Sequence, residues 1–312
     1  MSGLTENKII LIVRKTRLDE LINRFNTQAQ ARFYLEHLGA DFSSYQIEDA
    51  TYKQAVQLTQ KILSVFGRVQ TLDRQFLPNF VFGKNDLVVV IGQDGLVANV
   101  LKYLENQPVV GVNPDPEHLE GVLLPFLVPD LYALLPKIFN QNYAVHKISI
   151  AKAQLSNGHT LYAVNDFFIG AKTHVSARYR IQMNRREETQ SSSGVIVSTG
   201  LGSTGWLKSV LAGAQGISSA LLQKAVHIPE QMMAWDADYL YFSVREPWPS
   251  KNSAAELTFG KITRGQPLHI HSQMPENGVI FSDGIEQDFV EFQAGTMATI
   301  GLADKQGHLV VK

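Results

Sequence analysis

An uninterrupted apolar run, Val88-Val89-Val90-Ile91, leads directly into the turn Gly92-Gln93-Asp94-Gly95. Apolar residues without alternation indicate a strand that is buried on both faces, as in a parallel sheet. The two glycines let the backbone turn sharply and leave room for a ligand. Apolar residues then recur at helical spacing at Val97, Val100, Leu101 and Leu104. A strand, a glycine-bracketed carboxylate and a helix start are typical of doubly wound folds, which bind ligands at this point.

The composition limits the classes of protein that fit this chain. Its 312 residues favour two domains, and 28 Lys and Arg against 29 Asp and Glu leave a net charge of -1, so we expect no nucleic-acid partner. Cys is absent, which excludes disulfides and thiolate chemistry. We find no signal pattern near Met1 and no run of about 18 apolar residues, and therefore expect a cytoplasmic protein without a membrane partner.

Residues 1–142 read as one α/β domain. Apolar strands at Ile9 to Val13, Leu87 to Ile91 and Val109 to Val112 alternate with helical patterns, the last of them around Leu131 to Phe139. Such alternation predicts a doubly wound parallel sheet with helices on both faces, suited to nucleotide binding. Further helices are expected after Thr16, where Asp19 completes a capping box, and near Asp49 to Phe66.

Residues 143–312 read as a second, β-sandwich-like domain with one helical insertion. Short alternating segments are separated by turn residues, of which Ser156-Asn157-Gly158 is a strong hairpin signal. Strands are expected at residues 144–150, 159–164, 174–182, 194–198, 239–244, 268–272, 278–281 and 297–301. The last strands are able to pack back on the first domain, and a cleft between two such domains is the default ligand site.

A second glycine-rich segment, Ser198-Thr199-Gly200-Leu201-Gly202-Ser203-Thr204-Gly205-Trp206, lies within the β half. Its glycines allow close backbone approach, and Ser203 and Thr204 supply hydroxyls that we expect to cap the following helix. Amide groups at such a helix start suit a phosphate or an adenine edge. Taken singly, this turn and the Asp94 turn are each most simply explained as a capped helix start; only their combination favours a nucleotide site.

Together with Asn165-Asp166, these two segments resemble the ordered motifs of the ATP-dependent NAD kinase family. That family carries Gly-Gly-Asp-Gly-Thr, then Asn-Glu, then Ser-Thr-Pro-Thr-Gly-Ser-Thr-Ala-Tyr. The order and spacing match over residues 8 to 305, and Ser282-Asp283-Gly284 resembles the family's late Asp-Gly turn. The first motif is shared with diacylglycerol, sphingosine and phosphofructokinase families, whereas the Ser-Thr-x-x-Gly-Ser-Thr segment discriminates better.

The resemblance implies transfer of the γ-phosphoryl group of ATP, or of polyphosphate, to the 2′-hydroxyl of NAD with Mg²⁺, giving NADP. Asp94 matches the catalytic aspartate, and no residue is assigned as a metal ligand. Asn165 and Asp166 match contacts to the adenosine, Thr204 and Gly205 line the adenine, and Ser209 matches a position near the nicotinamide. The full set of implied nucleotide-binding and substrate-binding residues is Gly92, Gln93, Gly95, Asn165, Asp166, Thr199, Gly202, Ser203, Thr204, Gly205, Trp206 and Ser209. The family's habit further implies a homodimer or homotetramer.

The chain also departs from the family pattern. Gln93 replaces a glycine and Leu96 a threonine of the first motif, Asp166 replaces the glutamate, and Trp206 stands for the tyrosine. Ser193 stands where the family has an aspartate, and the segment after Asn113 differs. Two alternatives therefore stay open: a non-catalytic nucleotide-binding or regulatory protein of the same fold, and a kinase for a lipid or another small-molecule hydroxyl.

Two further constellations have a simpler explanation. His269 and His271 lie two residues apart, which suits a metal pair on one strand face, but no third ligand is evident, so a surface pair is favoured. Arg178, Arg180, Arg185 and Arg186 surround an expected hairpin end and indicate a solvated turn, with a phosphate clamp as the alternative.

Overall fold

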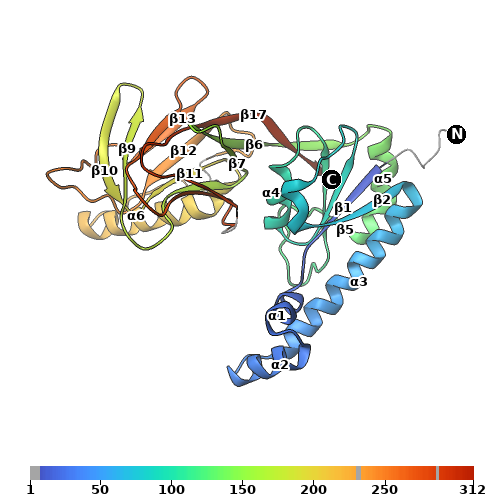
Figure 1. The fold of residues 1–312 in the computed structure, drawn as a ribbon. Coiled ribbons are helices and arrows are strands. Elements are labelled where there is room, and N and C mark those ends of the chain that lie inside the picture. Colours follow the sequence, from blue (N-terminus) through green and yellow to red (C-terminus); the bar gives the residue numbers. More distant parts are fainter. Residues whose placement is uncertain (1–7, 230–232, 286–287) are drawn as a thin grey trace. The chain divides into compact units, whose positions relative to one another are not determined.

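The computed structural model describes residues 8–229, 233–285 and 288–312, and the chain divides into two compact units (Figure 1). The first unit comprises residues 1–146 together with 308–312, and the second comprises residues 147–307. The long strand β17, Met297–Val311, starts in the second unit and ends in the first.

A parallel sheet forms the centre of the first unit. Its strands are β1 (Lys8–Val13), β2 (Arg68–Asp73), β3 (Leu87–Ile91), β4 (Pro108–Asn113) and the short β5 (Phe126–Leu127). They follow the order β2-β1-β3-β4, β5 pairs with β4, and the end of β17 joins β4 through Leu309 opposite Val109. After β1 the chain forms β2 on one side of it and then crosses to form β3 on the other side. The strand order therefore reverses at β1. This confirms the doubly wound α/β fold.

The later helices of this unit pack on the sheet through apolar faces, whereas the first two form a small core of their own with the start of the third. The helices are α1 (Arg17–Phe25), α2 (Gln28–His37), α3 (Phe42–Phe66), α4 (Asp94–Leu101) and α5 (Leu131–Phe139), with short 3-10 helices η1 (Arg74–Asn79) and η2 (Val128–Asp130). Ile62 of α3 and Leu135 of α5 share one core with Val89 and Val110 of the sheet, while α4 contacts β3 and β4. The capping box of Thr16 and Asp19 is confirmed.

Two local expectations for this unit were wrong. The edge strand β2 was not expected, because four of its six residues are neither buried nor apolar enough to produce a strand signal. Helix α3 begins at Phe42, seven residues before the expected start near Asp49, because Asp41 caps it by accepting from the Ser43 amide. Leu58 of this helix, although apolar, is 45% exposed.

Two antiparallel sheets face each other in the second unit. The first has the order β10-β9-β14-β17-β6-β7 and the second β13-β12-β11-β8-β15-β16. The strands of the first sheet, besides β17, are β6 (Ala144–Leu155), β7 (Thr160–Ala163), β9 (Ala177–Met183), β10 (Arg186–Ser192) and β14 (Leu268–Ser272). Those of the second are β8 (Asp166–Ala171), β11 (Val195–Ser198), β12 (Tyr239–Val244), β13 (Phe259–Thr263), β15 (Gly278–Ser282) and β16 (Phe289–Glu291).

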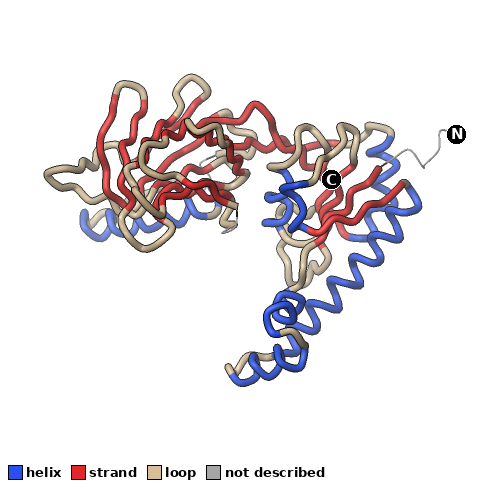
Figure 2. The backbone as a smooth tube through the Cα atoms, viewed as in Figure 1, coloured by secondary structure: helices blue, strands red, loops and turns tan. Residues whose placement is uncertain are grey.

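The core of the second unit lies between these sheets. Phe167 and Phe242 of one sheet and Tyr179 and Ile270 of the other are fully buried in it, which confirms the β-sandwich-like fold. Figure 2 shows that this unit is built almost entirely from strands, with α6 (Trp206–Leu222) as its helical insertion. The expected hairpin at Ser156-Asn157-Gly158 connects β6 to β7.

Strands β8, β10, β13 and β16 were not expected from the sequence. β8 matters most, because it makes Asp166 the first residue of a central strand. In β10 and β13 charged and small residues hide the strand pattern. Among the described residues, no helix is long and apolar enough to cross a membrane.

Candidate functional site

The turn Gly92-Gln93-Asp94-Gly95 lies at the carboxyl end of β3, next to β1, where the strand order of the first unit reverses. In doubly wound sheets this is the crevice in which ligands bind. The Gly92 amide donates to the Val112 carbonyl of β4 at 3.3 Å, which ties the turn to the neighbouring strand. The turn thus lies at the sheet edge that the sequence predicted, and its role as a ligand site stays a prediction.

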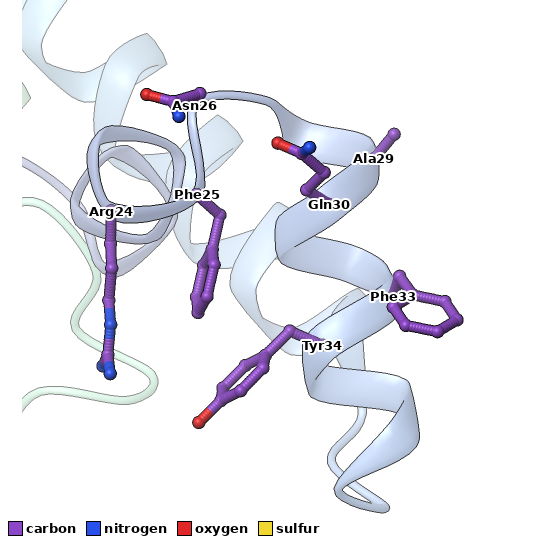
Figure 3. Close-up of a pocket in the computed structure, with 7 residues that line it drawn as sticks. All are labelled: Arg24, Phe25, Asn26, Ala29, Gln30, Phe33 and Tyr34. Carbon is purple, nitrogen blue, oxygen red and sulfur yellow. The ribbon is translucent and has the colours of Figure 1, made fainter.

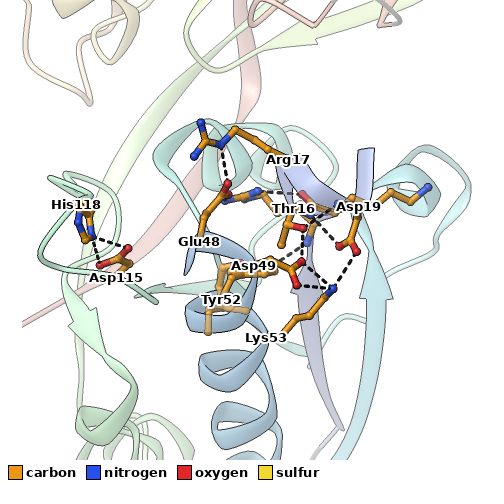
Figure 4. A network of polar contacts seen from close by, with 12 residues as sticks. Thr16, Arg17, Asp19, Glu48, Asp49, Tyr52, Lys53, Asp115 and His118 are labelled. Carbon is orange, nitrogen blue, oxygen red and sulfur yellow. Dashed lines mark hydrogen bonds and ion pairs between the residues drawn. The ribbon is translucent and has the colours of Figure 1, made fainter. Parts of the chain in front are cut away.

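Tyr52 of α3 connects the ends of β1 and β3 directly before this turn. Its hydroxyl accepts from the Arg14 amide at 2.9 Å and donates to the Ile91 carbonyl at 3.1 Å. Burial is the main cause that raises the pKa of this hydroxyl to about 12, so it keeps its proton at neutral pH. Figure 4 shows Tyr52 beside a polar network in which Glu48 binds Arg17, and Lys53 binds Asp19 and Asp49.

Replacing Tyr52 with phenylalanine is expected to destabilise the first unit by about 1–3 kcal/mol, because a buried amide and a buried carbonyl lose their partner. Thermal unfolding measures this, with Tyr132→Phe as the control, since Tyr132 is 55% exposed. Equal melting temperatures for the two variants would show that the hydroxyl does not hold the strand ends together.

Asp94 is the first residue of α4, but it does not cap this helix. The N-cap residue is Gln93, whose exposed side chain makes no capping hydrogen bond. The Asp94 carboxylate instead accepts from two backbone amides of a distant loop, at 2.8 Å from Leu123 and at 3.2 Å from Val122. Explaining Asp94 as a helix cap is therefore wrong, because the carboxylate is held in one orientation by residues almost thirty positions away.

A second group of predicted residues comes together in the second unit around the start of β8. The late turn residue Asp283 accepts through Oδ1 from the amides of Val164 (2.9 Å) and Asn165 (2.7 Å), and its own amide donates to the Asp166 carbonyl at 2.9 Å. Asp283 adopts a left-handed backbone with φ of 55°. These contacts seat Asn165-Asp166 against Ser282-Asp283-Gly284, although the sequence motifs lie more than a hundred residues apart.

The glycine-rich segment packs on the same two residues. The Thr199 amide donates to the Asn165 carbonyl at 2.9 Å, and the Thr199 hydroxyl lies 2.5 Å from the Val164 carbonyl, to which it donates. A Cβ atom on Gly202 would lie 2.0 Å from the Asn165 carbonyl oxygen, so only glycine fits there. Thr199 and Gly202 therefore shape the backbone that presents Asn165 and Asp166.

Asp166 is a buried acidic residue of this group with a strongly raised pKa. It is only 8% exposed, and its carboxylate receives no hydrogen bond from the residues that the structure describes. Burial, and then the negative charge of Asp283, raise the pKa of Asp166 to about 7. A buried carboxyl group with a strongly raised pKa and no internal partner is a typical feature of a ligand site.

Trp206, the first residue of α6, adds an aromatic surface to this group. Its ring stacks on Phe168 with centroids 5.7 Å apart and an interplanar angle of 15°, and Phe168 lies two residues after Asp166 on the same face of β8. The Arg245 guanidinium lies 5.5 Å from the centre of the Trp206 ring. Sequence reasoning did not include Phe168 and Arg245 in the site, because neither stands in a recognisable motif.

The expected capping role of Ser203 and Thr204 was wrong. These residues form a short 3-10 helix, η3 (Gly202–Thr204), and Gly205 is the N-cap of α6 without a side-chain hydrogen bond. The Ser203 hydroxyl donates to the Gly200 carbonyl (2.7 Å) and that of Thr204 to the Leu201 carbonyl (3.2 Å). Ser209 points its hydroxyl back to the Gly205 carbonyl at 3.3 Å. Local hydroxyl-to-carbonyl bonds thus replace the expected cap.

The remaining charged constellations of the second unit are accounted for locally. His269 shares a hydrogen bond of 3.1 Å with Thr299, and no group of three or more His, Asp or Glu side chains suited to a metal occurs within residues 8–229, 233–285 and 288–312. In the arginine patch, Arg180 pairs with Glu187 across the β9–β10 hairpin at 3.4 Å, and Arg186 pairs with Glu256, which lies shortly before β13, at 3.8 Å.

A surface pocket of about 560 Å³ lies at the junction of α1 and α2 (Figure 3). Phe25 and Tyr34 face each other with ring centroids 4.5 Å apart, and the Arg24 guanidinium lies over both rings, whereas Phe33 points outward and is 72% exposed. None of the predicted site residues lines this pocket. It is an aromatic surface formed by α1, α2 and the residues between them, and it does not include the Asp94 turn.

Proteins similar to this chain include NAD kinases and an NADH kinase. No family model matches the chain. In sequence it is 31% identical over 140 residues to an NAD kinase of Finegoldia magna, covering 42% of this chain and 50% of that protein. It is 30% identical over 137 residues to an NAD kinase of Caldanaerobacter subterraneus subsp. tengcongensis, covering 41% and 47%. The chain thus spans about half the length of the curated relatives it matches.

Solved structures extend the likeness in fold to nearly the whole chain. Yeast NADH kinase complexed with NADH matches with a TM-score of 0.60 and 15% identity, over 98% of this chain and 84% of that one. An NAD kinase from Archaeoglobus fulgidus in complex with ATP matches with a TM-score of 0.55 and 16% identity, over 97% and 92%. The chain is therefore NAD kinase-like, in fold over nearly its whole length and in sequence over the matched part.

Proposed function

We propose that this protein is a kinase that transfers a phosphoryl group to the 2′-hydroxyl of NAD or NADH and so forms NADP or NADPH. The observation that carries the proposal is the Asp94 carboxylate, held by two backbone amides at the ligand-binding edge of a sheet with the NAD kinase fold. The names of the similar proteins support the substrate class, since they include an NADH kinase bound to NADH and an NAD kinase bound to ATP.

In this mechanism Asp94 orients the acceptor hydroxyl and accepts its proton as the phosphoryl group is transferred. Phosphoryl transfer depends mainly on positioning and on charge stabilisation, so a carboxylate with a fixed orientation suits this task. The two amide contacts use two of its four lone-pair directions, and the others stay available for the hydroxyl. Gly95, where a Cβ atom would meet no neighbour within 4 Å, leaves space beside it for phosphates.

Within the second unit, the group around Asp166 has features that suit an adenosine. The Asp166 carboxylate accepts no hydrogen bond from the described residues and suits ribose hydroxyl donors, and Asn165 lies next to it in a backbone fixed by Thr199 and Asp283. The stacked rings of Trp206 and Phe168 present an aromatic surface, on which flat heterocycles bind well. The hydroxyls of Ser203, Thr204 and Ser209 donate to local carbonyls, which leaves their lone pairs as acceptors.

The divalent cation of this reaction fits a site with few protein ligands. Among the described residues no three carboxylate or imidazole groups gather, and Mg²⁺ in phosphoryl-transfer sites is held by one or two carboxylates plus the substrate phosphates. Asp94 is the carboxylate that would contact it. When bound, the ion supplies charge neutralisation at the phosphates.

The direct test incubates the purified protein with Mg²⁺, NAD or NADH, and either ATP or polyphosphate, and measures NADP or NADPH with an enzyme-coupled fluorescence assay. We expect product with at least one donor, and the two donor arms decide which is used. If no donor gives product with either acceptor, while ATP or NAD still raises the melting temperature, the protein is a nucleotide-binding relative without this activity, and the proposal fails.

A further inference from the structure

The loop between β4 and β5 holds the carboxylate of Asp94, and a single buried side chain shapes this loop. Asn113, the last residue of β4, is 5% exposed. Its Nδ2 group donates to the Leu119 carbonyl at 3.0 Å, and its Oδ1 atom accepts from the Asp115 amide at 2.9 Å. Through these two hydrogen bonds the Asn113 side chain holds together the first half of the loop, residues 114–119.

The second half of the loop is held against the sheet with almost no free space. A Cβ atom on Gly111 of β4 would lie 2.0 Å from the Leu123 carbonyl oxygen, and Leu123 and Leu124 are each 3% exposed. Gly121 has a left-handed φ of 67°, and a Cβ atom there would lie 2.6 Å from Nδ2 of Asn113. The amides that follow, of Val122 and Leu123, are those that bind Asp94.

One further contact braces the exposed tip of the loop. The His118 imidazole lies 2.9 Å from the Asp115 carboxylate (Figure 4), and this contact raises the pKa of His118. Because His118 is 69% exposed, this ion pair contributes little to stability. Asn113, in contrast, is buried, binds the first half of the loop through two hydrogen bonds and packs closely against Gly121 of the second half.

From this chain of contacts we infer that Asn113 is a positioning residue for Asp94: its side-chain amide folds the loop of residues 114–123, and the loop amides of Val122 and Leu123 fix the carboxylate in its reactive orientation. The catalytic part of this inference rests on the proposed kinase function, whereas the mechanical part does not. Without Asn113 the loop is free to move, and the carboxylate loses both donors that orient it.

The experiment compares Asn113→Ala with wild type in two independent measurements. The first is amide hydrogen exchange at Val122 and Leu123, which reports directly on the bonds to Asp94. We expect exchange at least tenfold faster in Asn113→Ala, and likewise in Asp94→Ala, which removes the acceptor. The matched control is Asn140→Ala, which changes an exposed asparagine of the same unit and is expected to leave both amides protected.

The second measurement is turnover. We expect kcat for NADP formation to fall roughly 100-fold in Asn113→Ala, the size of effect that a misplaced reacting group produces, while KM for ATP changes less than threefold. If Asn113 only stabilised the fold, its loss would lower the melting temperature and the active fraction. The folded enzyme would then keep both its kcat and its KM.

Two further variants cover the case in which Asn113→Ala does not fold. Asn113→Asp keeps the acceptor for the Asp115 amide and loses the donor to Leu119, and Gly121→Ala places a methyl group against Nδ2 of Asn113. Either one is expected to release the Val122 and Leu123 amides. Unchanged protection in a folded Asn113 variant or in Asp94→Ala would overturn the inference, whether or not wild type forms NADP. If wild type forms no NADP, fast exchange still supports the clamp, and only the proposed function fails.

Discussion

Replacing Asp94 with asparagine is expected to lower kcat for NADP formation by roughly 10²–10⁴-fold, the range that a positioned general base contributes. Asparagine has nearly the same shape, but it cannot accept the proton of the ribose hydroxyl. It also offers only one acceptor oxygen, so one of the two loop amides, of Val122 or Leu123, loses its partner. The chemical step should therefore suffer far more than nucleotide binding.

Three measurements on Asp94→Asn separate these effects. Initial rates at saturating substrates give kcat, a thermal shift with ATP or NAD gives binding, and the melting temperature without ligand reports the cost of the unpaired amide, which is about 1–3 kcal/mol for a buried group. Asp304→Asn is the control, because its carboxylate is 97% exposed in the second unit. If Asp94→Asn keeps more than half of the wild-type rate, Asp94 is not a catalytic residue.

The second large effect is expected for the substitution Asp166→Asn, which should stabilise the protein to a degree that depends on pH. Because burial and Asp283 raise the pKa of Asp166 to about 7 from a value of 3.8 in a model compound, the folded protein binds this proton more tightly than the unfolded chain does. Between pH 4 and 7 the unfolding free energy therefore decreases as the pH rises. Above pH 7 the charged Asp166 carboxylate lowers the unfolding free energy by roughly 4 kcal/mol, at 1.36 kcal/mol per pKa unit.

Asp166→Asn removes this cost because an amide stays neutral at every pH. We expect the variant to melt several degrees above wild type at pH 8, and the difference to shrink steadily towards pH 4. Thermal unfolding of both proteins at four or five pH values measures it, and Asp304→Asn should show no such trend. A difference in melting temperature that is constant from pH 5 to 8 would contradict a raised pKa at Asp166.

This gain in stability should come with a loss of ligand binding. A carboxylate that is buried without a hydrogen bond from the described residues is kept at the expense of stability, and such groups cluster at functional sites. The raised pKa thus links the two properties of Asp166: it weakens the empty protein near neutral pH and leaves an acceptor for the hydroxyls of a substrate.

Several local features could be predicted because neighbouring residues decide them. Thr16 and Asp19 form a capping box within one helical turn, and Ser156-Asn157-Gly158 turns a hairpin between adjacent strands. Other features depend on partners that are distant in sequence. Strand β8 exists because β11 and β15 flank it on both sides, and its own residues Asp166-Phe167-Phe168-Ile169-Gly170-Ala171 carry only a weak pattern.

The same distinction applies to the candidate site. The motifs predicted Asp94, Asn165-Asp166 and the segment around Thr199 as site residues, and the structure shows that Asn165, Thr199 and Gly202 contact one another. The capping role of Ser203 and Thr204 was wrong, since a hydroxyl beside a flexible glycine has several carbonyls within reach. The role of Asn113 could not be predicted from the sequence, because the partners of its side chain are backbone groups of the loop that only the fold brings into reach.

By itself, the sequence determined the fold class of both halves and the edge of the sheet at which Asp94 lies. A short run of β-branched apolar residues such as Val88 to Ile91, ended by a glycine turn, favours a strand inside a sheet that is covered on both faces. Only the tertiary structure decided the orientation of the Asp94 carboxylate and the proton affinity of Asp166. Both depend on burial and on hydrogen-bond donors or charges that distant segments, around Leu123 and Asp283, bring within a few ångströms.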